Sequence, residues 1–86
     1  MFKIKAADGT NNLCGRRIAK IRKEQGLSQR KLAMKMQLLG FDVDHYFIRR
    51  VENGERFVTD IDLVIFSKAL QVPISALLSA EDVELL

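Results

Sequence analysis

The reactive and hydrogen-bonding side chains of this chain are mainly basic and amide groups, and most of them lie between residues 16 and 56. There is one histidine, His45, and one cysteine, Cys14. Neither is accompanied by a glycine-rich phosphate loop or by paired carboxylates in a plausible cleft, so a catalytic set is missing and we do not expect an enzyme. An arginine guanidinium, in contrast, can bind phosphate or form two hydrogen bonds with the edge of a guanine.

Charge is distributed unevenly along the 86 residues, whose net charge is +3. Residues 1–56 carry 13 Lys and Arg against six Asp and Glu, a net +7, whereas residues 57–86 carry one against five, a net −4. Phosphate contacts release condensed counterions and dominate the affinity of proteins for nucleic acids. The basic part is therefore where a polyanion would bind, although a well-solvated charged surface would have the same composition.

Length and cysteine content limit the class of protein. Eighty-six residues suit one compact domain. A single cysteine excludes a disulfide framework or a cysteine-based zinc site within one chain, and His45 with Asp42 and Asp44 would make a poor metal site. The first residues lack the apolar stretch of a signal peptide, and no apolar run approaches the roughly 20 residues of a membrane span. We expect a cytoplasmic protein that has no cofactor, no metal and no membrane contact.

Hydrophobic periodicity predicts an all-α fold of five short helices. The chain divides into an N-terminal arm or short strand (1–11), a helical domain (12–79) and a C-terminal tail or short helical turn (80–86). The predicted helices cover about 12–25, 29–39, 44–53, a stretch that begins at Thr59 and reaches Leu70, and 75–78.

Capping residues support these boundaries. Asn12, Ser28 and Asp44 can each accept hydrogen bonds from the first amides of a helix, and Thr59 with Asp62 is an acidic variant of the capping box. Gly26, Gly40 and Gly54 follow the first three helices, where a left-handed residue commonly ends a helix. Pro73 separates the fourth helix from the fifth.

Two helices joined by a tight connector, the second with exposed polar side chains, can place a helix in the major groove of DNA. The residues that carry a resemblance are Arg22, Gly26-Leu27-Ser28-Gln29, Leu32-Ala33, Ile48, Val51-Glu52-Asn53-Gly54 and Leu70-x-Val72. In order and nearly in spacing they resemble the Cro and phage-repressor-like helix-turn-helix family, also called the XRE family, over about Leu13 to Leu78.

This resemblance implies a compact five-helix, lambda-repressor-like DNA-binding domain and a transcriptional regulator, most simply a repressor, that binds a double-stranded DNA operator as a homodimer. One departure concerns the connector. The third helix begins at Asp44, eight residues after Met36, where the family usually needs about three. The inserted region, 37–42, should extend the second helix by about a turn and lengthen the connector, as in a sub-branch of the family.

Placing residues 100° apart around the third helix puts Ile48 and Val51 on the core side. The expected DNA base contacts come from the opposite side and from the first turn, with Arg50 the preferred reader of guanine; they are His45, Tyr46, Arg49 and Arg50. Phe47 is expected to pack against the connector, on Phe41 or Val43.

Expected phosphate contacts flank this helix. In the family, a Gln in the position of Gln29 binds phosphate and supports the first reader, and the amides at the start of that helix add an anion site. The full set is Ser28, Gln29, Arg30, Asn53 and Arg56. The resemblance also implies a semi-buried ion pair of Arg22 with Glu52 that serves structure rather than readout.

A second hypothesis is an antitoxin-like module that binds a protein partner and also regulates its own operon. The same DNA-binding face would then be present, so the sequence hardly separates the two. Candidate surfaces for a homodimer are the acidic and apolar stretch 76–86 and the alternating stretch 2–5.

Overall fold

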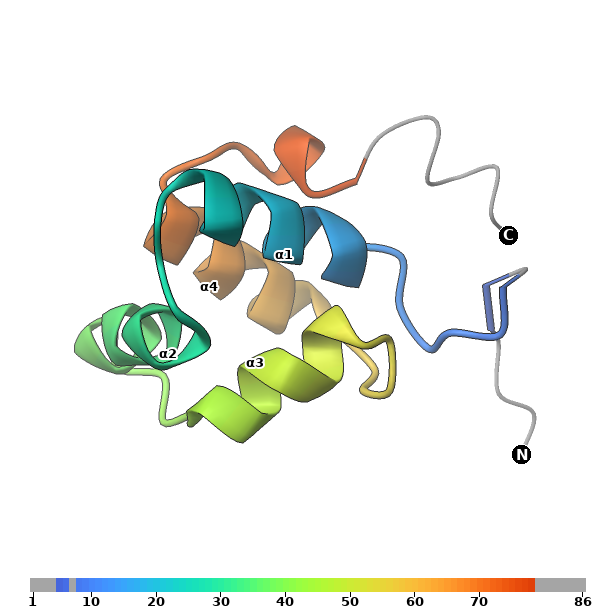
Figure 1. The fold of residues 1–86 in the computed structure, drawn as a ribbon, viewed down its shortest axis with the longest axis horizontal. Helices are drawn as coiled ribbons and strands as arrows, with labels where there is room; N and C mark the ends of the chain where they lie inside the picture. The colour runs from blue at the N-terminus through green and yellow to red at the C-terminus, as the bar shows by residue number, and fades with distance from the viewer. Residues whose placement is uncertain (1–4, 7, 79–86) are drawn as a thin grey trace.

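The computed structural model describes residues 5, 6 and 8–78, and this part of the chain forms four α-helices and one 3-10 helix joined by short loops (Figure 1). The helices are α1 (Gly15–Glu24), α2 (Gln29–Leu38), α3 (His45–Glu52), α4 (Asp60–Leu70) and the 3-10 helix η1 (Ile74–Ala76). These described residues contain no strand, and the predicted all-α class is confirmed.

The fifth predicted helix, 75–78, is replaced by the single turn of η1. A helical nucleus fixes several backbone dihedrals for its first hydrogen bond, and three residues after Pro73 are too few to repay that cost by further bonds. The predicted additional turn from Ser79 lies outside the described residues, as do most of the two stretches considered as dimer surfaces.

The predicted N-caps of the second, third and fourth helices are confirmed. Ser28, Asp44 and Thr59 each accept a hydrogen bond of 3.0 Å from the backbone amide three residues on. Asp62 accepts one from the amide of Thr59, also at 3.0 Å, which completes the capping box. These caps satisfy amides that a helix start leaves without an intrahelical partner, and so they fix where each helix begins.

The first helix starts later than predicted. Asn12 does accept a hydrogen bond from the amide of Gly15, at 2.8 Å, as its expected capping role requires. The regular helix begins only at Gly15, however, with Cys14 in the N-cap position. The side chain of Asn12 therefore closes a turn ahead of α1 instead of opening its first turn.

The core lies between the four α-helices. Its largest fully buried side chains come from all of them and from the residue after η1; they are Ile18, Leu32, Met36, Ile48, Val51, Phe66, Leu70 and Leu77. In Figure 1, α1 lies above α3, with α4 behind them and α2 beside the start of α3. None of the helices in the described ranges is long and apolar enough to cross a membrane.

Candidate nucleic-acid interface

Helix α3 presents one polar face to solvent and one apolar face to the core. Phe47, Ile48 and Val51 are buried, as the helical projection predicts for the last two. Of the residues expected to contact bases, Tyr46, Arg49 and Arg50 are exposed and His45 is half-buried. The face that could reach a DNA groove is therefore accessible along the length of the helix.

Two aromatic rings cover the first turn of that face. The rings of His45 and Tyr46 lie with their centroids 4.1 Å apart and are inclined by 34°. Tyr46 keeps 52% of its surface exposed, although it touches its neighbour. A ring held by another ring has fewer rotamers to lose on binding, so this pair offers a partly ordered contact surface.

The connector between α2 and α3, residues 39–44, is anchored at both ends. The amide of Phe41 donates to the carbonyl of Met36 at 3.0 Å, and the side chain of Gln37 donates to the carbonyl of Val43 at 2.7 Å. Gly40 adopts φ +88°, the left-handed conformation that allows the chain to turn away from α2. The lengthened connector is thus held to the body of the domain by its own hydrogen bonds.

Phe47 packs against the connector as expected. Its ring meets that of Phe41 edge to face, with centroids 6.1 Å apart. On the other side it stacks on Phe66 of α4 at 5.9 Å, and the guanidinium carbon of Arg56 lies 4.8 Å from its centroid. Sequence patterns did not indicate these last two contacts, which link α3 to α4 and to the loop between them.

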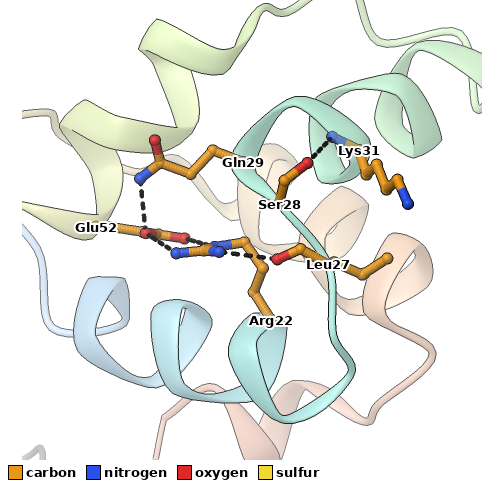
Figure 2. Close-up of polar contacts among 6 residues, drawn as sticks. All are labelled: Arg22, Leu27, Ser28, Gln29, Lys31 and Glu52. Carbon is orange, nitrogen blue, oxygen red and sulfur yellow. Dashed lines mark hydrogen bonds and ion pairs between the residues drawn. The ribbon is translucent and has the colours of Figure 1, made fainter.

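A buried polar cluster fixes the other side of α3 (Figure 2). Arg22 on α1 donates to both carboxylate oxygens of Glu52, from Nε at 2.6 Å and from Nη2 at 2.9 Å. Its Nη1 donates to the carbonyl of Leu27 at 2.8 Å, just before α2. The paired side chains keep only 10% and 6% of their surface exposed. One guanidinium thereby joins the end of α1, the start of α2 and the end of α3.

The hydrogen bonds from Arg22 to Glu52 raise the pKa of the guanidinium above its ordinary value, outweighing burial, which acts in the opposite direction. Arg22 therefore remains charged and keeps its partner. Glu52 also accepts a third hydrogen bond, from the side-chain amide of Gln29 at 3.0 Å. The sequence did not indicate this link between the first turn of α2 and the last turn of α3.

The residues expected to contact phosphate lie at two places. Ser28, Gln29 and Arg30 are at the start of α2, where Ser28 is occupied as the cap and Gln29 points toward α3 (Figure 2). Asn53 and Arg56 follow α3 and are exposed, with Arg56 also resting on the ring of Phe47. Of these side chains, Arg30, Asn53 and Arg56 are exposed and basic or amide-bearing, whereas Gln29 is half-buried and donates to Glu52.

The N-terminal segment holds the C-terminal end of α3, which sequence reasoning did not anticipate. The backbone amide of Asn11 donates to the carbonyl of Gly54 at 2.8 Å, and its side chain donates to Glu55 at 2.9 Å. The side-chain amide of Asn12 donates to the carbonyls of Val51 at 3.0 Å and Arg56 at 2.8 Å. Part of the predicted arm or strand is thus a turn against the end of α3.

Within the described residues, no group of three or more His, Cys, Asp or Glu side chains could hold a metal ion. The exposed side chains on and just after α3 include the guanidinium groups of Arg49, Arg50 and Arg56 and the amide of Asn53. Guanidinium and amide groups are the side chains that proteins use to bind phosphates and the edges of purines.

Comparisons with known proteins agree with this geometry. A sequence model of the helix-turn-helix family matches residues 18–77. Among solved structures, the restriction-modification controller protein C.AhdI from Aeromonas hydrophila is similar at 29% identity and a TM-score of 0.66, over 77% of this chain and 92% of that one. A search of curated proteins found no significant match.

A second solved structure, a hypothetical transcription factor, NHTF, from Neisseria, aligns over 100% of this chain and 95% of its own, with a TM-score of 0.68. At 19% identity this likeness concerns the fold alone. The family match spans well over half of the chain and includes α2, α3 and the connector. The chain belongs to the helix-turn-helix family of the Cro and phage-repressor (XRE) type, whose members are DNA-binding regulators of transcription.

Proposed function

We propose that this protein is a repressor that recognises a specific double-stranded DNA operator with α3 in the major groove. The observation that carries this proposal is the accessible polar face of α3, set at a fixed position by buried contacts on its other sides. Sequence-specific binding needs base-reading side chains that are both exposed and held in place. Tyr46, Arg49 and Arg50 are exposed, and buried contacts hold the helix that carries them.

The four side chains proposed to contact bases differ in the hydrogen bonds that they can form. Arg49 and Arg50 can each form two hydrogen bonds with O6 and N7 of a guanine, and a good pair of this kind gives about 1–3 kcal/mol of discrimination between bases. Tyr46 can donate to a base or phosphate or contact a thymine methyl, and His45, whose tilted ring lies against that of Tyr46, offers ring nitrogens near the same position. We assign base recognition chiefly to Arg50 and place the other three around it.

Phosphate binding positions the helix. We assign it to the start of α2 and to the residues after α3, where the donors are Ser28, Gln29, Arg30, Asn53 and Arg56. Free amides at the N-terminus of α2 and the helix dipole add to the attraction for an anion. The net +7 of residues 1–56 supports this assignment.

We further propose a symmetric dimer on two half-sites about one helical turn apart, since such regulators commonly read two-fold symmetric operators. The controller role named for the 29% identical C.AhdI is consistent with a small regulator of this kind. Each protomer would contribute one α3 to the complex.

The test is selection of duplexes from a random library, followed by titration of the selected and a scrambled duplex across a salt series. We expect a clear preference for the selected duplex and a steep loss of affinity as salt rises. Arg50→Ala should relax the preference at one or two base pairs. Lys23→Ala, which removes a positive charge from exposed α1 surface, is the matched control and should keep the preference. Equal affinity of the parent protein for both duplexes would overturn the proposal.

A further inference from the structure

The side chain of Asn12 uses both its carbonyl oxygen and its amide nitrogen to join three parts of the fold. Its Oδ1 accepts from the amide of Gly15 at 2.8 Å, which closes the turn before α1. Its Nδ2 donates to the carbonyl of Val51, in the last turn of α3, and to that of Arg56, in the loop toward α4. One amide therefore sets the end of α3 relative to the start of α1.

Asn11 and Thr10 extend this attachment past the end of α3. Asn11 binds the carbonyls of Gly54 and Glu55. Gly54, with φ +75°, lies so close to Thr10 that a Cβ there would overlap with the threonine side chain. The last carbonyls of a helix have no intrahelical partner, and Asn12 supplies a partner for one of them, that of Val51, while Asn11 and Asn12 bind carbonyls of the loop that follows α3.

A second close approach occurs at Gly15. A Cβ at this position would overlap with the carbonyl oxygen of Val51, so α1 and α3 touch through their backbones. The end of α3 is thus held by direct contact as well as by hydrogen bonds. Its beginning is held separately, by the connector and by the rings around Phe47.

From this arrangement we infer that Asn12, assisted by Asn11, is a positioning residue for DNA recognition. It sets the orientation of α3 relative to α1, and this orientation determines the direction in which Arg49 and Arg50 point. It also holds the backbone of Arg56, one of the assigned phosphate ligands. This inference rests on the proposed function and assigns a part in it to a segment that carries none of the proposed DNA contacts.

Specific and non-specific binding should respond differently to loss of this attachment. Readers must be held to about 0.5 Å and 10–20° to keep two hydrogen bonds with one base. Attraction to phosphates depends on the number and location of charges and tolerates a small tilt of the helix. A change at Asn12 should therefore weaken binding to the operator while leaving binding to random DNA nearly as it was.

Asn12→Asp in the full chain tests this inference. The aspartate keeps an oxygen that can accept from Gly15 but replaces the donor toward Val51 and Arg56 by an acceptor that repels their carbonyls. We expect the ratio of specific to non-specific affinity to fall about tenfold, comparable to one mismatched base pair. The added negative charge lowers the affinity for both duplexes alike and therefore cancels in this ratio.

Gln25→Ala is the matched control. It removes a hydrogen bond of the same kind, from a side-chain amide to the carbonyl of Leu70 at 2.7 Å, that joins the residue after α1 to α4 and does not involve α3. This variant should lose stability but keep the ratio of specific to non-specific affinity. If Asn12→Asp unfolds, Asn11→Ser, which removes only the donor to Glu55, replaces it and should show a smaller change in the same direction.

A structural measurement completes the test. Residual dipolar couplings of the free proteins should show that α3 is tilted relative to α2 and α4 in the Asn12→Asp variant and unchanged in Gln25→Ala. Equal loss on both duplexes, or an unchanged orientation of α3, would overturn the positioning role. If the parent protein itself shows no preference for any duplex, the proposed function fails and the inference falls with it; a parent that discriminates and a variant that discriminates equally well would refute the inference alone.

Discussion

Replacing Glu52 by alanine should lower the free energy of unfolding by about 3 kcal/mol, the loss typical of a buried charge deprived of its partner. The carboxylate accepts two hydrogen bonds from Arg22 and one from Gln29, at 2.6, 2.9 and 3.0 Å. After its removal the guanidinium of Arg22, whose side chain is 10% exposed, keeps its hydrogen bond to the carbonyl of Leu27 but loses both bonds to the carboxylate. Glu24→Ala, on exposed surface of α1, is the control and should change stability by less than about 0.5 kcal/mol.

A double-mutant cycle separates the pair from its surroundings. Arg22→Met and Glu52→Met should each cost about 3 kcal/mol, whereas the double variant should cost clearly less than the sum, because an apolar pair leaves no unpaired buried charge. We expect a coupling energy of at least about 2 kcal/mol. Glu52 raises the pKa of Arg22 in the folded state. The charged guanidinium therefore adds its full share to the free energy of unfolding at any pH below its unfolded pKa, and this share is lost only as pH rises through the raised pKa of the folded state.

Urea denaturation followed by circular dichroism gives these free energies, since the described fold is helical throughout its regular structure. The variants should shift the midpoint without changing the slope. A cost below about 1 kcal/mol for Glu52→Ala, or single effects that simply add in the double variant, would refute the view that this pair organises the ends of α1 and α3.

Three further predictions concern the elements around α3. Gly15→Ala should cost about 1–3 kcal/mol in urea denaturation, because the added methyl meets the backbone of α3; an unchanged midpoint would show that the two helices separate freely. Thr59→Ala should cost about 1 kcal/mol through loss of the cap of α4, whereas Thr59→Ser should cost less, and equal losses would argue against the cap. Hydrogen bonds from Thr10 lower the pKa of Asp8, so the stability that this carboxylate adds is present above its unfolded pKa of 3.8 and is lost as pH falls through the folded value. Asp8→Asn should therefore reduce the pH dependence of the urea midpoint in the acid range, and an identical pH profile would contradict this cause.

Features of the fold that depend on residues close together in the sequence could be predicted from it. Asp44 and Thr59 mark helix starts because a side-chain oxygen three residues before a free amide is a local signal, and both act as expected. Helical periodicity, in agreement with the family resemblance, placed Ile48 and Val51 in the core, and both are fully buried. Family resemblance added the overall arrangement, which the helix-turn-helix match confirms.

Contacts between distant residues were not predictable in the same way. Asn12 was interpreted as a helix cap, which accounts for its oxygen, but its nitrogen binds residues 39 and 44 positions away. No local sequence pattern assigned a role to Gly15, although the close approach of α1 to α3 leaves no room for a side chain there. Asn and Gly are common in turns for reasons of their own conformation, so their types do not reveal a partner far along the chain.

The same limit applies to the readers. Periodicity indicates which residues of α3 face away from the core, and the exposure of Tyr46, Arg49 and Arg50 agrees with it. It does not indicate that the ring of His45 lies against that of Tyr46 or that Arg56 rests on Phe47, because both contacts depend on the rotamers of the folded chain. Which base each side chain contacts stays a prediction.

In the proposed complex, α3 enters the major groove while the start of α2 binds the adjacent DNA backbone. Titration of the full chain with the selected duplex, followed by backbone amide NMR, locates the DNA-binding surface residue by residue. We expect the largest chemical-shift changes along His45–Glu52 and at residues 28–30, with α4 little affected. The largest changes on α4 and η1, with α3 unperturbed, would contradict it.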